Sequence, residues 1–177
     1  MKSLLLALGL TLCCFVQAED IRFENLDHSL LASQGFVVAM ATNCEKMKGM
    51  MTKIPVLPIS FVQGSEGKLK MTMDMPTPKG CKAIKVKIEK KGGVYVAKCG
   101  KGGKKTVEYA NASENYVLMS MTAEQQEEEC QIVSATVKDL VHTEEAAAAL
   151  KKFAVRRNLQ DEKVKVLSTQ GMCPRSS

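Results

Sequence analysis

Short strands separated by turns are the feature that most constrains how this chain folds. Between Phe36 and Val137 the sequence is a series of short apolar or alternating runs, and no long helical period interrupts them. The breaks between the runs are rich in Gly and Pro, which adopt or pre-set the backbone angles of tight turns. We expect an all-β domain with eight strands, over residues 36–42, 56–63, 68–75, 81–90, 93–99, 104–110, 115–122 and 129–136.

Alternation within the strands indicates which side of each strand is buried. In residues 68–75, one Leu and three Met residues alternate with charged or hydroxyl-bearing residues, and in residues 84–89 Ile and Val alternate with Lys and Glu. A sheet with one apolar face and one wet face has this period of two. We therefore expect the Met face to point into a closed interior. Met adapts to irregular apolar ligands, although it fills gaps in a core more often.

One amphipathic helix is expected after the strands, and one irregular segment between the first two. Thr143 is expected to cap the helix, and two Glu residues follow it while two Arg residues lie near the other end, each pair complementing the partial charge of its terminus. The apolar residues that recur on one face are Ala147, Leu150, Phe153 and Ala154. The segment expected to be long and irregular is residues 43–55.

The first 18 residues have the features of a secretory signal peptide. Lys2 precedes a short apolar stretch that ends at Ala18, a small residue followed by acidic Glu19. This stretch is too short to cross a bilayer, and no later segment has transmembrane length. We therefore expect residues 1–18 to be removed and residues 19–177 to be secreted as one domain without a membrane span.

Neither the charge nor the polar residues indicate nucleic-acid binding or catalysis. The formal net charge of +6 is modest, Trp is absent, and Tyr95 is the sole aromatic residue in the most basic stretch. His28 and His142 lie in different segments, and neither has metal-ligand spacing with Cys, Asp or Glu. The Gly-rich run at residues 100–106 lacks the Gly-Lys-Thr ending of a phosphate-binding loop. We expect no enzyme, no cofactor and no metal.

Three motifs give the chain a resemblance to the lipocalin family. Residues 36–43 resemble the family's first strand, residues 78–81 resemble its turn and cysteine before the fourth strand, and residues 150–173 resemble its helix and tail. Extracellular fatty-acid-binding and epididymal lipocalins have the most similar pattern. The resemblance implies an eight-stranded up-and-down antiparallel barrel with one C-terminal α-helix packed on its outside. It also implies a disulfide between Cys81 and Cys173.

Two family motifs are missing. The first is Gly-x-Trp, whose Trp closes the barrel floor beneath an Arg near the end of the eighth strand. Here the corresponding residues are 33–35, which end in Gly35, and the Arg position corresponds to Thr136 or a neighbour. The joint loss is physically coherent, because losing one partner alone would leave a hole or an unpaired charge. How the floor is closed is left open.

The second missing motif is the family's Thr-Asp-Tyr turn before the seventh strand, which residues 111–116 replace. Asn111, Ala112 and Ser113 instead form an N-glycosylation acceptor, which we expect to lie in a loop and to be occupied.

The resemblance implies that the chain binds and carries a small hydrophobic ligand inside the barrel, such as a fatty acid, a retinoid or a similar amphiphile. From strand alternation, the residues expected to contact it are Val37, Ala39, Ala41, Ile59, Phe61, Leu69, Met71 and Met73. An acidic ligand would also need a basic group. Five lysines are available, although such residues usually face solvent: Lys85, Lys87, Lys98, Lys104 and Lys105.

Two alternative functions stay open. One lipocalin is a prostaglandin isomerase whose nucleophilic Cys lies inside the barrel near the second strand. This chain has no Cys between Cys44 and Cys81, and Cys44 is expected in the loop after the first strand. The other alternative is a secreted storage or defence protein without a specific ligand.

Five cysteines follow the signal peptide, so at least one has no partner within the chain. If Cys81 pairs with Cys173, Cys44, Cys99 and Cys130 remain. In an up-and-down barrel the start of the eighth strand lies near the end of the first, which brings Cys44 near Cys130 and leaves Cys99 on the opposite wall. We expect Cys44–Cys130 as the candidate second disulfide. Cys99 is then a free thiol that could link two chains in a dimer.

Overall fold

The computed structural model describes most of the chain after residue 20. The described residues are 21, 22, 25, 27, 29 and 31 and the segments 34–65, 68–98, 103–125 and 128–175. The expected signal peptide, His28 and Cys99 lie outside them.

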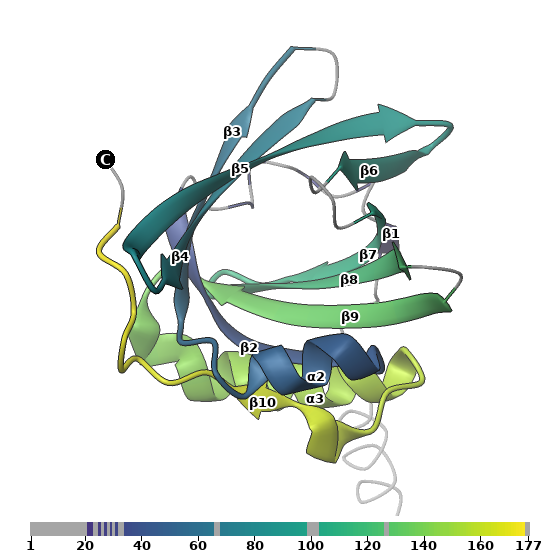
Figure 1. Cartoon of the computed structure of the whole chain (residues 1–177). Coiled ribbons are helices and arrows are strands. Elements are labelled where there is room, and N and C mark those ends of the chain that lie inside the picture. The colour runs from purple at the N-terminus through teal and green to yellow at the C-terminus, as the bar shows by residue number, and fades with distance from the viewer. Residues whose placement is uncertain are drawn as a thin grey trace, which may run out of the picture.

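Eight antiparallel strands close into a barrel, which confirms the expected fold class (Figure 1). Each strand pairs with the next along the chain, and the last pairs with the first. The barrel strands are β2 (Gln34–Thr42), β3 (Leu57–Gln63), β4 (Leu69–Thr77), β5 (Gly80–Lys91), β6 (Val94–Lys98), β7 (Lys104–Ala112), β8 (Tyr116–Gln125) and β9 (Glu128–Val137). All eight coincide closely with the runs expected from the sequence.

Two very short strands lie where neighbouring barrel strands stop pairing. β3 pairs with β2 only over residues 34–37, and β10 (Lys165–Val166) pairs beyond that point with Met40 and Ala39. In the same way β6 pairs with β7 only over residues 104–107, and β1 (Ile21–Arg22) pairs with Ala110 and Tyr109. Both strands therefore satisfy backbone groups that the barrel itself leaves unpaired.

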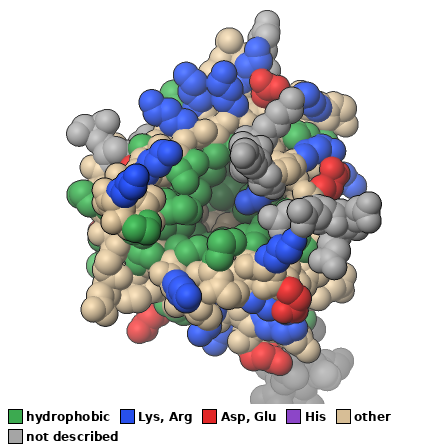
Figure 2. All heavy atoms as spheres, in the orientation of Figure 1, with side chains coloured by type: hydrophobic (Ala, Val, Ile, Leu, Met, Phe, Trp, Pro, Cys, Tyr) green, Lys and Arg blue, Asp and Glu red, His purple; other side chains and the backbone are tan. Residues whose placement is uncertain are grey.

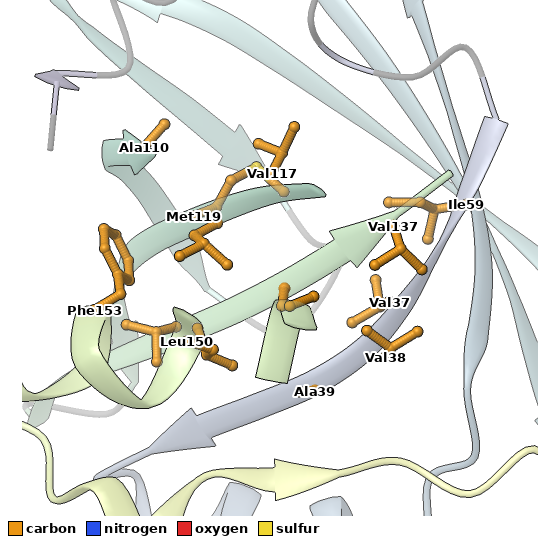
Figure 3. Close-up of a cluster of buried hydrophobic side chains, with 14 of the residues drawn as sticks. Val37, Val38, Ala39, Ile59, Ala110, Val117, Met119, Val137, Leu150 and Phe153 are labelled. Atoms are coloured by element: carbon orange, nitrogen blue, oxygen red, sulfur yellow. The ribbon is translucent and has the colours of Figure 1, made fainter. Parts of the chain in front are cut away.

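The helix α3 (Thr143–Arg156) covers the outside of β2, β8 and β9. Its Leu150 and Phe153 side chains are fully buried and lie in the same apolar cluster as residues of these strands (Figure 3). The expectation that Thr143 caps this helix is wrong. The Thr143 hydroxyl instead donates to the carbonyl oxygen of Leu140, because a 3₁₀ turn, η5 (Leu140–His142), leads directly into the helix. Within the described residues, no helix is long and apolar enough to cross a membrane.

The C-terminal tail is tied to the barrel wall by a disulfide and a cation–π contact. Cys81 and Cys173 are bonded with their Cα atoms 5.8 Å apart, as the resemblance implied. Beyond them, the Arg175 guanidinium lies 4.5 Å from the ring centre of Phe36 and donates a 3.0 Å hydrogen bond to Gln34. A further 3₁₀ turn, η6 (Asp161–Lys163), lies between α3 and β10.

Candidate ligand cavity

The pairing of neighbouring strands shows which residues face the interior of the barrel. Ile59 lies opposite Met73, which lies opposite Ile84, and Phe61, Met71 and Val86 form the next such row. Residues directly opposite each other share one face of a sheet. The other face of β4 carries Lys70, Thr72 and Asp74. Figure 2 looks along the barrel into a hollow lined by hydrophobic side chains, with Lys and Arg around its rim.

A bulge in β2 reverses the alternation that the sequence suggested. Val37 lies opposite Thr136, but after the bulge between Val37 and Ala39 the residues opposite Ala39 and Ala41 are Ala135 and Val133. Those two residues lie on the outer face beneath α3, and both alanines are completely buried. The expectation that Ala39 and Ala41 face the cavity is therefore wrong.

Met40 takes the inward position that Ala39 and Ala41 were expected to share. It lies opposite Ser134 and contacts a small apolar cluster near the end of β2. Periodicity alone could not reveal this residue, since one additional residue in the strand changes which neighbours point inward.

Exposure along the inner face separates a packed end of the barrel from an open end. Ile59, Phe61 and Leu69 are buried, as is Val37. The large apolar inward residues that are partly exposed include Met40, Met71, Met73, Met75, Ile84 and Met121. Four of these six were not among the expected ligand contacts. The methionine-rich end therefore offers the apolar surface that a ligand can contact, while the other end is filled by its own side chains.

A short helix lies at the open end, where the sequence suggested an irregular segment. This helix, α2 (Glu45–Met51), follows Cys44, which is bonded to Cys130 of β9 with a Cα–Cα distance of 5.2 Å. The second expected disulfide is therefore confirmed. Met47 of α2 packs against the cluster around this disulfide, and Met51 is buried.

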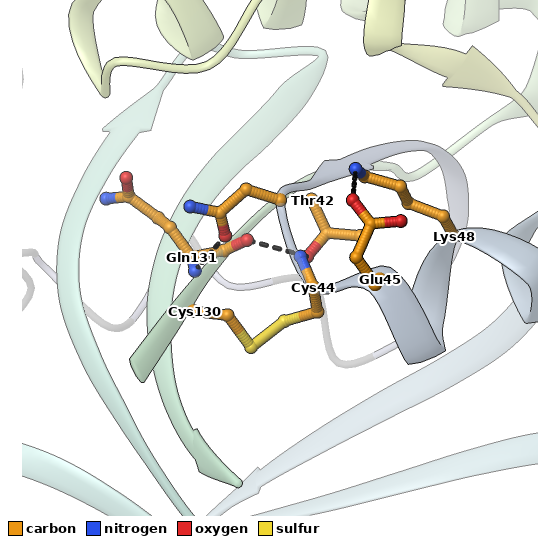
Figure 4. Close-up of polar contacts among 7 residues, drawn as sticks. Thr42, Cys44, Glu45, Lys48, Cys130 and Gln131 are labelled. Carbon is orange, nitrogen blue, oxygen red and sulfur yellow. Dashed lines mark hydrogen bonds and ion pairs between the residues drawn. A yellow bond between two sulfur atoms is a disulfide. The ribbon is translucent and has the colours of Figure 1, made fainter. Parts of the chain in front are cut away.

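Polar contacts fix the beginning of α2 to β9 (Figure 4). The Thr42 hydroxyl donates to the carbonyl oxygen of Gln131 at 2.7 Å and accepts from the Cys44 N–H at 3.0 Å. Asn43 accepts a 2.7 Å bond from the Gln131 N–H. Within the helix, Lys48 donates to the Glu45 carboxylate, and this bond together with the lysine's charge lowers the pKa of Glu45.

Strand pairing places one of the five lysines considered from the sequence on the inner face. Lys105 is half-buried and lies opposite Ala97 and Ala123, in the same row as Ile88. Three others lie on the outer face: Lys85, Lys87 and Lys104. The backbone of Lys98 pairs with Lys87 on one side and with Lys104 on the other. An inward lysine near apolar side chains is suited to the acidic group of an amphiphile.

The floor is closed without the Trp and Arg of the family motif. A Cβ atom at Gly35 would lie 2.7 Å from the carbonyl oxygen of Val137, so β2 and β9 approach too closely for a side chain there. The nearby Thr136 hydroxyl is buried and has no hydrogen-bond partner among the described residues. It lines a small pocket together with Leu31, Phe61, Ser113, Glu114, Tyr116, Val117, Met119, Val137 and Lys138.

The described residues contain no group of three or more His, Cys, Asp and Glu side chains placed to hold a metal ion. His142 contacts Glu145 of α3 on the surface, 3.3 Å away. Cys44 has no free thiol, because it is bonded to Cys130. Both disulfides lie within one chain, so they give no support to the dimer expected through Cys99.

Asn111 does not lie in the loop where the sequence placed it. It belongs to β7, opposite Leu118, and is 6% exposed. A glycan on this side chain would require the amide to reach solvent. Its occupancy stays a prediction.

Comparisons with known proteins agree with this architecture. No protein-family model matches the chain. It is 29% identical over 184 residues to an extracellular fatty acid-binding protein of Coturnix japonica, covering 98% of this chain and 97% of the relative. The corresponding protein of Gallus gallus is 28% identical over 180 residues, with the same coverage.

Solved lipocalin structures have the same fold. The siderocalin Ex-FABP superimposes with a TM-score of 0.68 at 24% identity, covering 84% of this chain and 96% of that one. Lipocalin 12 from rat epididymis also gives a TM-score of 0.68, at 13% identity, covering 82% of this chain and 87% of that one. The sequence motifs, the closed barrel with its C-terminal helix and these similarities together show that the chain has the lipocalin fold and is similar over nearly its whole length to extracellular fatty acid-binding proteins.

Proposed function

We propose that this protein is a secreted carrier of a small hydrophobic molecule, which it holds at the methionine-rich end of the barrel. The observation that carries the proposal is the row of inward, partly exposed side chains on β2, β4, β5 and β8, dominated by Met. Unbranched, polarizable Met side chains adapt to the shape of an apolar ligand. The names of the two relatives, extracellular fatty acid-binding proteins, support both the secretion and the ligand class.

We further propose that the ligand is acidic and that Lys105 contacts its acidic group. The inner-face position of Lys105 supports this, because its cross-strand neighbours Ala97 and Ala123 are apolar and its ammonium group can pair with an anion. The expected contacts that keep an inward position are Val37, Ile59, Phe61, Leu69, Met71 and Met73. Binding is proposed rather than catalysis, because the four described cysteines are in disulfides and offer no thiolate.

Displacement of a fluorescent fatty acid tests the binding proposal. Met71→Lys should abolish binding, since burying an unpaired ammonium group in an apolar cavity is costly. Val62→Lys is the matched control, because Val62 is on the outer face of β3, 59% exposed, and should bind as the wild type does. Unchanged affinity in Met71→Lys that circular dichroism shows to be folded would refute the proposed site.

The acidic-group proposal needs a separate comparison. Lys105→Gln should weaken binding of a long-chain fatty acid by about tenfold, corresponding to about 1.4 kcal/mol, and leave binding of the matching fatty alcohol unchanged. Equal loss for both ligands would show that Lys105 supports the wall of the cavity rather than the ligand's charge.

We also propose that the mature protein begins at Glu19, after the signal peptide of residues 1–18. Intact-mass measurement of protein collected from a secreting culture tests this, and retention of the first 18 residues would contradict it.

A further inference from the structure

Four lysines lie directly opposite one another across four adjacent strands. Lys70 of β4 pairs with Lys87 of β5, Lys87 pairs with Lys98 of β6, and Lys98 pairs with Lys104 of β7. Strands are about 4.8 Å apart, so this lysine row extends about 14 Å across the barrel wall.

Lys70, Lys87 and Lys104 of this row face away from the ligand cavity. The residues next to them in the chain, Leu69, Met71, Val86, Ile88 and Lys105, belong to the inner face, and successive side chains in a strand point to opposite faces. Lys70 and Lys87 are exposed, and the Lys104 side chain is 49% exposed. Figure 2 shows Lys and Arg side chains gathered on the side of the molecule where β3 and β5 lie.

Like charges directly opposite each other destabilise a sheet. This arrangement therefore lowers the stability of the barrel relative to an outer face on which positive and negative side chains alternate. The row contains three such pairs. One carboxylate offsets them at one end, where Glu124 lies 3.3 Å from Lys104. Glu89 follows two residues after Lys87 on the same face of β5, and Lys85 lies on its other side.

We infer that the lysine row binds a linear polyanion, and specifically a sulfated polysaccharide of the extracellular matrix or cell surface. Charge complementarity favours a negatively charged partner. The shape favours a chain, because no second continuous line of cations lies beside the row. The same-face positions on one side are Thr72 and Lys85, and those on the other side are Lys68, Glu89, Val96 and Thr106. A flat anionic membrane would be matched better by a broad basic patch. Since the row lies outside the barrel, a polysaccharide could bind while the cavity holds its ligand.

Heparin, as the probe, tests this inference by surface plasmon resonance on the purified secreted protein in about 0.15 M salt, where exposed charges are largely screened beyond 8 Å. We expect the double variant Lys70→Glu, Lys87→Glu to bind at least tenfold more weakly. The matched control is Lys151→Glu, Lys152→Glu on the exposed side of α3, which changes the net charge equally and should stay within twofold of the wild type. Both variants should bind the fluorescent fatty acid with the affinity of the wild type, which separates this result from the cavity proposal.

Several outcomes would overturn the inference. These are absence of heparin binding by the wild type, equal weakening in the two double variants, and equally tight binding of heparin and duplex DNA. Binding to phosphatidylserine vesicles without binding to heparin would overturn it as well and would assign the row to a membrane surface. A less severe variant, Lys70→Ser with Lys87→Ser, keeps the test decisive if the charge reversal impairs folding, and it should also weaken heparin binding at least tenfold.

Discussion

The Thr42 hydroxyl donates a hydrogen bond to the Gln131 carbonyl oxygen 2.7 Å away, and so joins the end of the first barrel strand to the last one. Thr136, on the same inner face near the floor, has a buried hydroxyl with no hydrogen-bond partner among the described residues. A threonine hydroxyl is therefore hydrogen-bonded at one end of the barrel, and another lacks a hydrogen-bond partner at the other end.

Replacing each of these threonines by the nearly isosteric Val should have opposite consequences. Thr42→Val removes a bonded hydroxyl and leaves the Cys44 N–H without its acceptor, so it should lower the free energy of unfolding by about 1–3 kcal/mol. Thr136→Val removes a hydroxyl that forms no protein bond and should leave stability unchanged or raise it by up to about 1 kcal/mol. Urea unfolding measures both, and a clear loss in Thr136→Val would indicate a bound water in the floor pocket.

Gly35 should tolerate no side chain, since a Cβ atom would lie 2.7 Å from a backbone oxygen that cannot easily move. Gly35→Ala is expected to destabilise the fold by about 1–3 kcal/mol. The control is Gly49→Ala in α2, where no atom lies within 4 Å of the new Cβ atom. That change should be neutral or stabilising by up to about 1 kcal/mol, because Ala favours helix. Thermal unfolding that ranks the two variants in the reverse order would contradict the described floor.

Loss of the Cys44–Cys130 disulfide should be strongly destabilising. The bond joins residues 86 apart in sequence, and on a chain-entropy model closing such a loop stabilises the fold by about 4–5 kcal/mol. The double variant Cys44→Ala, Cys130→Ala should unfold at a correspondingly lower denaturant concentration, whereas Cys99→Ser should match the wild type. Alkylation without reduction, followed by mass spectrometry, should modify Cys99 alone among the five cysteines.

The outward position of Ala39 predicts how a larger side chain would act there. Ala39→Leu should destabilise the fold by about 1–3 kcal/mol, because it is completely buried on the face beneath α3. Affinity for the fluorescent fatty acid should persist in the folded fraction. Met40→Ala, one residue along, should instead weaken binding. If Ala39→Leu reduced affinity without loss of stability, the residue would face the cavity after all.

The sequence predicts the strands well because each alternates with period two between turn residues, and this pattern is local. It fails at β2, where the bulge after Val37 is a property of the pairing with β9 and has no signature in β2 itself. Lys105 and the outer lysines could not be told apart for a related reason, since adjacent charged residues leave the register ambiguous. The sequence does not predict helix α2, because seven residues that include Gly49 carry too weak a helical signal.

The two-residue strands β1 and β10 bear on how this protein behaves at high concentration. Unpaired strand edges are templates on which other chains can assemble. A barrel presents such edges wherever two adjacent strands stop pairing with each other. β1 pairs with residues 109–110 of β7, where β7 no longer pairs with β6. β10 pairs with residues 39–40 of β2, where β2 no longer pairs with β3. Each adds an edge only two residues long, too short to recruit a further strand. The segments that contain β1 and β10 therefore protect the barrel from edge-to-edge aggregation. Deleting either segment should make the protein aggregate on heating at a temperature below that of its unfolding.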